Sequence, residues 1–159
     1  DLDAFAVLYM MERRGWSIAE VRSRLAKGGG LAGLSGVAGG DVRDLERSAL
    51  EGNRDAALAL AVLAYEVRKT IGAYAAAMGG VEAVAFTGGI GENSARLRAA
   101  CCLNLDFLGI RLDGGRHEAG SGDRIISPDG APVAVLALAA NEELIVARRA
   151  YAVLAEKGG

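Results

Sequence analysis

Hydrophobic positions in the first part of the chain recur every three or four residues, which is the spacing of one face of an α-helix. The first such stretch ends at Gly15, and its apolar positions are Phe5, Leu8, Tyr9 and Met11. A second stretch, residues 17–30, opens with Ser17 and Glu20 at capping-box spacing and closes on glycines. The pattern therefore predicts two short amphipathic helices.

A glycine-rich stretch and a longer helical pattern follow. Residues 31–40 show no regular period, so we expect a loop there, and a short helix is predicted to begin at Asp41. Residues 53–78 repeat apolar and small side chains at intervals of three or four. This spacing predicts a long helix that packs closely through its small residues and ends at the glycines 79–80.

The second half of the chain alternates short apolar runs with helical patterns. Strands are predicted at residues 81–86 and 107–112, with a helix at 92–102 between them. Two further strands are expected around the turn at residues 128–130, and a closing helix at 141–154. This order predicts an α/β fold with mostly buried strands.

Composition narrows the class of protein. The 159 residues carry a net charge of −2, which gives no broad basic surface, so we expect no nucleic-acid partner. The alanine-rich helix contains Glu66, Arg68 and Lys69, so we expect neither a membrane span nor a membrane partner. Cys101 and Cys102 are sequence neighbours without metal-binding spacing, which favours a reducing, cytoplasmic setting. The chain starts without methionine inside a helical pattern, so we expect a fragment.

Three polar segments interrupt the apolar pattern, and the first is TGGIGENS at residues 87–94. Glycine in an ordered segment costs roughly 0.5–1 kcal/mol relative to alanine, so the cluster implies positive φ or close approach to another group. A strand, a glycine turn and a helix start would present main-chain N–H groups to an anion or nucleotide. A tight turn capped by Asn93 or Ser94 is the purely structural alternative.

A dinucleotide site is a second alternative for this segment. Gly89 and Gly91 after a strand, with Asp113 about 20 residues further on, imitate a dinucleotide-binding fingerprint. Ser94 replaces the third glycine, and Glu92 would put negative charge beside the pyrophosphate. A long helical segment also precedes what should be an early strand. These three departures weaken the NAD alternative and leave it open.

The second polar segment is GGDVRDLE at residues 39–46. Asp41 there is a candidate N-cap for the helix that follows. Surface ion pairs are expected on this helix, either of Arg43 with Glu46 or of Arg47 with Asp44 or Glu51. Taken by itself, the segment indicates capping rather than ligand binding.

The third polar segment, NEEL at residues 141–144, places Glu142 and Glu143 directly after an apolar strand. Acidic residues in the first turn of a helix are expected from the helix dipole alone, so a metal role needs further context. The one histidine, His117, falls in a polar stretch and is expected to be a solvated loop residue.

Together, and in this order, these segments resemble the C-terminal half of the acetate kinase family, which belongs to the acetate and sugar kinase, heat-shock 70 and actin superfamily. The matching stretches lie at residues 29–37, 41–45, 70–98, 107–113 and 141–144. The resemblance implies a ribonuclease-H-like (actin-like ATPase) half-domain, in which helices cover a sheet after a helical lead-in. Residues 1–80 would be that lead-in, and residues 81–159 the α/β nucleotide-binding segment.

The resemblance also implies site residues, with ATP/ADP and Mg²⁺ as cofactors. The segment that lines the adenosine pocket in the family is matched by Asp41, Val42 and Arg43. The glycine-rich nucleotide loop is matched by Gly89, Ile90, Gly91, Glu92 and Asn93. Glu142 matches the acidic residue associated with Mg²⁺, and the side chains of Ile90 and Val42 would offer apolar surface to a purine. No residue is assigned a catalytic role, because the family's transition-state histidine and arginine lie upstream of the matched part.

The implied activity is reversible transfer of a phosphoryl group between ATP and acetate, giving ADP and acetyl phosphate. Propionate or another short-chain carboxylate, with its acyl phosphate, is an alternative substrate, and an inactive nucleotide-binding or interaction module is an alternative function. The resemblance implies a homodimer for the intact enzyme, while the isolated chain is expected to be inactive. Two departures from the family pattern, Ala139-Ala140 and Gly39-Gly40, remove hydroxyl side chains near the expected site.

Overall fold

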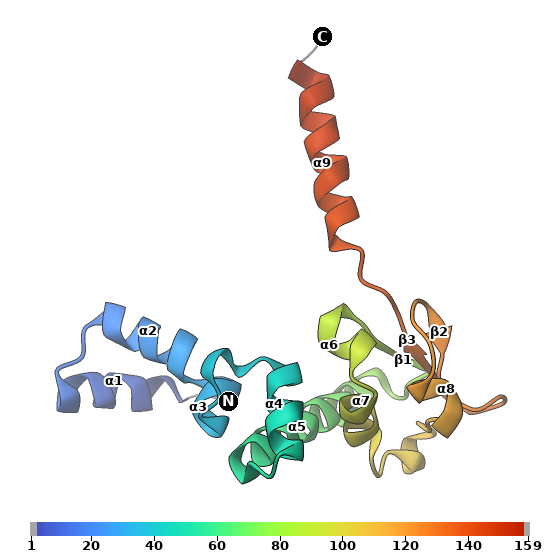
Figure 1. The fold of residues 1–159 in the computed structure, drawn as a ribbon, viewed down its shortest axis with the longest axis horizontal. Coiled ribbons are helices and arrows are strands. Elements are labelled where there is room, and N and C mark those ends of the chain that lie inside the picture. The colour runs from blue at the N-terminus through green and yellow to red at the C-terminus, as the bar shows by residue number, and fades with distance from the viewer. Residues whose placement is uncertain (1–2, 158–159) are drawn as a thin grey trace. The chain divides into compact units, whose positions relative to one another are not determined.

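The computed structural model describes residues 3–157, apart from a few side chains in the last helix, namely Glu142, Ala152, Ala155, Glu156 and Lys157. The chain divides into two compact units, Asp1–Glu66 and Val67–Gly159, and the boundary falls inside the long helix α5 (Arg54–Met78). Figure 1 labels the elements of each unit. The functional division after residue 80 stays a prediction.

The first unit opens with the two predicted helices, α1 (Ala4–Arg14) and α2 (Ile18–Gly28). Gly15 ends α1 in the left-handed conformation at φ +64°. Ser17 and Glu20 form the predicted capping box, in which the Glu20 side chain accepts from the Ser17 N–H at 2.7 Å. Both helices are confirmed.

The prediction of a loop over residues 31–40 is wrong, because a short helix α3 (Gly30–Ser35) and a 3-10 turn η1 (Ala38–Gly40) form there. The Ser35 hydroxyl donates to the Leu31 carbonyl at 2.6 Å and accepts from the Val37 N–H at 3.0 Å. These bonds satisfy main-chain groups at the end of a helix that is too short to show a period. The next helix, α4 (Val42–Leu50), begins after Asp41 as predicted.

Helix α5 confirms the long predicted helix. The Asn53 side chain starts it by accepting from the N–H groups of Asp55 and Ala56 at 3.0 and 3.1 Å. Its buried positions are mostly alanines, namely Ala56, Ala59, Leu60, Ala64 and Ala75. Among the residues that the structure describes, no helix combines the length and the apolar character needed to cross a bilayer.

The second unit contains a small mixed sheet (Figure 1). Its strands are β1 (Ala83–Phe86), β2 (Arg124–Ile125) and β3 (Ala134–Ala137). The strand order is β1-β3-β2, with β3 parallel to β1 and antiparallel to β2. The buried cluster against this sheet is Cys102, Leu105, Ile110, Ile126, Val133, Val135 and Ala137. The strand at 81–86 and the strand pair around the 128–130 turn are therefore confirmed.

The predicted strand at 107–112 is wrong. A 3-10 turn η2 (Asp106–Leu108) begins the segment, and Gly109 follows at φ +83°. A Cβ at Gly109 would lie 2.9 Å from the Pro132 Cβ. The main chain at this turn therefore packs too closely against Pro132 to leave room for a side chain. Ile110 is nevertheless 1% exposed, because this connection fills the core without joining a ladder in the described part of the sheet.

Helices in the second unit also differ from expectation. The predicted helix at 92–102 is divided into α6 (Gly88–Asn93) and α7 (Ala95–Cys102). Ser94 separates them and caps α7 by accepting from the Leu97 N–H at 2.9 Å. His117 lies in a short helix α8 (Gly114–Glu118) and is 9% exposed, so the prediction of a solvated loop histidine is wrong. The closing helix α9 (Glu142–Lys157) is confirmed.

Candidate nucleotide site

The glycine-rich segment forms a helix directly after strand β1. Thr87 occupies the N-cap position of α6 without a side-chain capping bond, and Gly88 follows at φ +72°. The first N–H groups of a helix have no partners within the helix. Because the Thr87 side chain does not cap them, main-chain donors at this end of α6 can serve another group.

Glycine occupies the three positions of this segment for different physical reasons. Gly88 needs its positive φ, which disfavours any side chain. A Cβ at Gly91 would lie 3.1 Å from the main-chain carbon of Phe86, so close packing against the end of β1 favours glycine there. Gly89 has no positive φ, and a Cβ there would meet nothing within 4 Å. Gly89 is therefore the one of these three glycines that the fold of the chain does not explain.

A pocket of about 380 Å³ lies beside Gly89, between α6 and the connection from β3 to α9. Its lining residues are Gly89, Glu92, Ala140, Asn141 and Glu143. One carboxylate oxygen of Glu92 accepts from the Ala140 N–H at 2.5 Å and joins the two walls. The first and third polar segments of the sequence thus border one pocket.

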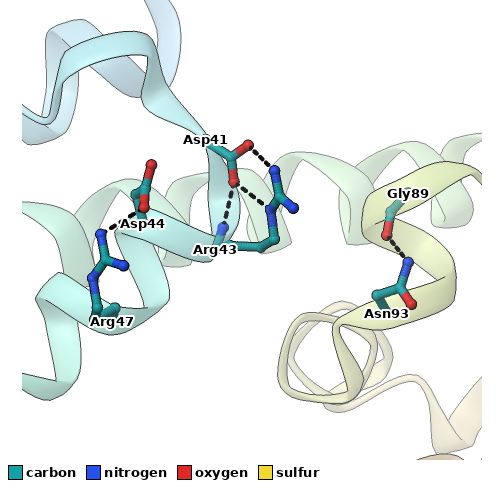
Figure 2. A network of polar contacts seen from close by, with 6 residues as sticks. All are labelled: Asp41, Arg43, Asp44, Arg47, Gly89 and Asn93. Atoms are coloured by element: carbon teal, nitrogen blue, oxygen red, sulfur yellow. Dashed lines mark hydrogen bonds and ion pairs between the residues drawn. The ribbon is translucent and has the colours of Figure 1, made fainter.

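Asn93 and Ile90, the remaining expected site residues of this segment, differ in exposure and contacts. The Asn93 amide donates to the Gly89 carbonyl at 2.8 Å within α6 (Figure 2). Ile90 is 46% exposed, so its side chain is accessible to a ligand. A partly exposed apolar side chain beside main-chain donors fits the flat face of a base.

In the first unit, Asp41 and Arg43 form a compact ion pair at the start of α4 (Figure 2). One oxygen of Asp41 accepts from the main-chain N–H of Arg43 at 2.9 Å, and the guanidinium binds both oxygens at 3.1 and 2.9 Å. These hydrogen bonds from Arg43 lower the pKa of Asp41 from 3.8 to about 2. Val42 is 4% exposed, so its buried side chain does not offer the apolar surface that we expected for a purine.

The ion pairs predicted on α4 are found in part. Arg47 binds Asp44 at 2.6 Å, as one of the alternatives expected (Figure 2). Arg43 instead contacts Asp41, which the sequence predicts only as a cap. The N-cap role of Asp41 is itself confirmed by its bond to the Arg43 N–H.

Sequence reasoning missed two residues that support the pocket. Asp123 accepts from the Ala139 N–H at 2.8 Å and holds the connection after β3. Arg98, which is 2% exposed, donates to carbonyls at the end of α6. The only signal in the sequence was an arginine beside the apolar positions of a short helix, and such a pattern does not identify the contact partners.

The pocket offers oxygen donors that fit Mg²⁺ only in part. Its carboxylates are those of Glu92 and Glu143, and the Asn141 side-chain oxygen already caps α9 by accepting from the Leu144 N–H. The side chain of Glu142, which the family resemblance assigns to the metal, lies outside the described residues. Within the described part of the chain no group of three or more ligating side chains gathers. This donor set fits an ion held by one or two carboxylates, with phosphates and water completing its shell.

The small sheet with its covering helices defines an α/β protein of the actin-like ATPase class, since the chain superimposes on solved kinases of that class. It covers 39% of the Porphyromonas gingivalis acetate kinase structure with 97% of its own length, at a TM-score of 0.85 and 35% identity. A Francisella tularensis propionate kinase structure matches at a TM-score of 0.81 and 29% identity, over 92% of this chain and 37% of that one.

The family follows from the sequence. The model of the acetokinase family matches residues 1–148, and the chain belongs to that family. The acetate kinase of Heliobacterium modesticaldum is 44% identical over 154 residues, which are 97% of this chain and 38% of that protein. The chain thus spans about two fifths of the length of the curated relatives that it matches.

Proposed function

We propose that this chain forms the adenosine-binding side of an acetate kinase, which transfers a phosphoryl group reversibly between ATP and acetate. The products of the forward reaction are ADP and acetyl phosphate. The observation that carries the proposal is the pocket beside Gly89, where α6 and the acidic connection before α9 meet. Membership of the acetokinase family and relatives named acetate kinase support acetate as the acceptor.

Each proposed site residue has a distinct task. Gly89 lets the main chain of α6 approach the ribose and phosphates, Gly91 lets α6 pack closely against Phe86, and Ile90 contacts the base. Glu92 holds the pocket walls together, and Asn93 stabilises α6 from within. Asp41, Val42 and Arg43 form the adenosine-facing segment at the start of α4, where Asp41 and Arg43 supply the polar groups and Val42 anchors the segment by its burial.

Phosphoryl transfer depends mainly on positioning and on neutralising the charge of the transferred group. When bound, Mg²⁺ supplies part of that neutralisation, and we assign Glu142 to it. The residues of this chain bind and orient the nucleotide. The transition-state groups implied by the family resemblance have no counterpart here, so we expect the 159-residue chain by itself to have negligible kinase activity.

A second candidate function is propionate kinase, which the structural match to the Francisella tularensis protein favours. The proposed nucleotide-side residues would serve either acceptor acid, because they bind the donor. Cytoplasmic localisation and a homodimer of the intact enzyme stay predictions. Light scattering of the purified chain measures its oligomeric state.

Titration of the chain with ADP, with and without Mg²⁺, tests the proposed function. Saturable ADP binding that Mg²⁺ strengthens is expected, with NAD failing to compete. Glu142→Gln should abolish the gain from Mg²⁺, whereas Glu82→Gln, which alters an exposed acid outside the pocket lining, should retain it. An ADP affinity below detection, or preference for NAD, would reject the nucleotide role. Robust acetyl phosphate formation by the isolated chain would contradict its expected inactivity.

A further inference from the structure

Arg98 is the most deeply buried charged residue in the described part of the chain, at 2% exposure. Its guanidinium donates from Nη1 to the carbonyls of Gly91 and Glu92, both at 2.8 Å. Nη2 donates to the carbonyl of His117 at 2.5 Å. One side chain thus binds the main chain of two different helices.

The three acceptors lie at helix C-termini, where carbonyls lack partners within the helix. Gly91 and Glu92 belong to the last turn of α6, and His117 to the last turn of α8. The negative ends of both helices therefore face a cation. A guanidinium can serve several acceptors in a fixed fork, which a single ammonium group cannot reproduce.

The charge of Arg98 has no acidic partner among the ion pairs of the described residues. Burial lowers the pKa of Arg98, and the nearby positive charge of Arg124 lowers it further. Its Nε is buried without a hydrogen-bond partner. Burying a cation without a carboxylate costs stability, so this arrangement points to a requirement for position rather than for stability.

The carbonyls that Arg98 holds connect directly to the pocket wall. Glu92 receives the Arg98 bond on its main-chain oxygen and uses its side chain to accept from the Ala140 N–H. Ala140 and Glu92 both line the pocket beside Gly89. A continuous set of contacts therefore runs from α8 through Arg98 and Glu92 to the connection before α9.

We propose that Arg98 is a positioning residue that fixes the end of α6, so that Glu92 and the connection before α9 stay at the spacing that a nucleotide requires. Arg98 acts through these groups and does not touch the nucleotide. The functional half of this inference, that nucleotide binding requires Arg98, rests on the proposed nucleotide site. The structural half, that Arg98 holds the end of α6 and the connection before α9 in place, rests on the hydrogen bonds alone.

Amide hydrogen exchange without nucleotide tests the structural half. The variant is Arg98→Met, and the matched control is Arg96→Met, which alters an exposed arginine on the same helix. We expect exchange at least about tenfold faster at the Ser94 and Ala140 amides in Arg98→Met only. Unchanged exchange there, or equal acceleration throughout the sheet, would overturn the inference.

ADP affinity tests the functional half under conditions where every variant is folded. Arg98→Met should bind ADP at least about tenfold more weakly than the wild-type chain, and Arg98→Lys should fall between them. In Arg98→Ala, millimolar methylguanidinium should restore part of the affinity, which a general loss of packing would not allow. If Arg98→Met does not fold, Arg98→Lys and the rescued Arg98→Ala decide the question.

The outcomes separate the two proposals. Wild-type affinity in Arg98→Met, or absence of rescue in a folded Arg98→Ala, would overturn the positioning role while leaving the nucleotide site intact. A wild-type chain that binds no ADP would reject the proposed function and the nucleotide role of Arg98 with it. In that case amide exchange still decides whether Arg98 holds α6 and the connection in place.

Discussion

The start of α4 and the end of α6 both hold a proposed site segment through an arginine, but they do so at very different distances along the chain. Arg43 binds Asp41, two residues away, and its side chain is 87% exposed. Arg98 binds carbonyls six, seven and nineteen residues away and is 2% exposed. The first contact is a local property of four or five residues, while the second exists only once the second unit has folded.

This difference determines how each segment responds to perturbation. Exposed ion pairs are screened by salt and contribute little to stability, so the Asp41 contact sets a local conformation and little else. Buried hydrogen bonds to a charge are costly to leave unmade, so the α6 region depends on packing around α7 and α8. We therefore expect large effects from changes near α6 and small effects from changes near Asp41.

The largest expected effect concerns the thiols of α7. Burial raises the pKa of Cys101 to about 11 and that of Cys102 to about 12, from an ordinary 9.0. Since the thiolate is the reactive form, alkylation of the folded chain at pH 8 should be at least about a hundredfold slower than alkylation of the urea-unfolded chain. Mass spectrometry after iodoacetamide treatment measures both rates. Equal rates would show that α7 is not packed as described.

Gly91 and Gly89 form the next test, because an added side chain should disturb the fold at Gly91 and the proposed ligand contact at Gly89. Gly91→Val would push a side chain into the main chain of Phe86 and should lower the free energy of unfolding by about 2 kcal/mol. Urea denaturation measures this loss. A stability equal to that of the wild-type chain would mean that α6 does not pack on β1 as described.

Gly89→Ala should behave in the opposite way. A Cβ at Gly89 meets no protein atom, and alanine favours helix by roughly 0.5–1 kcal/mol, so stability should not fall. The added methyl group would occupy the approach to the α6 main chain, so ADP affinity should drop about tenfold. Retained affinity in a stable Gly89→Ala would move the nucleotide away from this pocket.

Removing the cap of α7 should have a smaller effect. Ser94 is 7% exposed and accepts from the Leu97 N–H, so Ser94→Ala leaves a helix N–H without its partner. The expected loss is about 1 kcal/mol of unfolding free energy. Ser94→Asp, which can accept the same bond, serves as the control and should recover most of the loss. Equal destabilisation by both variants would show that the cap is not the cause.

The smallest effect is expected at Asp41. Its folded pKa of about 2 lies below the ordinary 3.8, so its contribution is present above pH 3.8 and is lost as the pH falls through about 2. Asp41→Asn keeps a capping oxygen but cannot titrate. The stability difference between wild type and Asp41→Asn should therefore be constant above pH 4 and shrink below it, as followed by circular dichroism. A constant difference down to pH 2 would contradict the local ion pair.

Local signals in the sequence predicted the long elements correctly. The capping box at Ser17 and Glu20, the stop at Gly15 and the period of residues 53–78 each act within one or two turns. Residues 107–112 misled the prediction because an apolar run shows that a segment is buried but not whether it joins a ladder. Residues 87–94 read as a turn because glycines disfavour helix locally, whereas the folded chain forms a short helix there whose carbonyls accept from Asn93 and Arg98.

For the candidate site, residue types and spacing indicated Gly89, Glu92 and the acidic pair after β3 as candidate binding residues. The family resemblance then assigned these segments to one nucleotide and Mg²⁺ site. Nothing in the sequence indicated that Glu92 would accept from Ala140, 48 residues away. Arg98 and Asp123 also escaped notice, since their contacts depend on which main-chain groups are left without partners after folding. Such partners are a consequence of helix ends meeting in space.

The sequence by itself determined the caps, the long helix, the strands at 81–86 and around the 128–130 turn, and the membership of the acetokinase family, because each of these rests on short-range patterns or on motif order. Tertiary structure alone decided that α6 is a helix, that His117 is buried, and that Glu92 and Arg98 connect three elements. Such contacts arise when distant main-chain donors and acceptors must find partners away from water. Local residue preferences carry no information about which partners those will be.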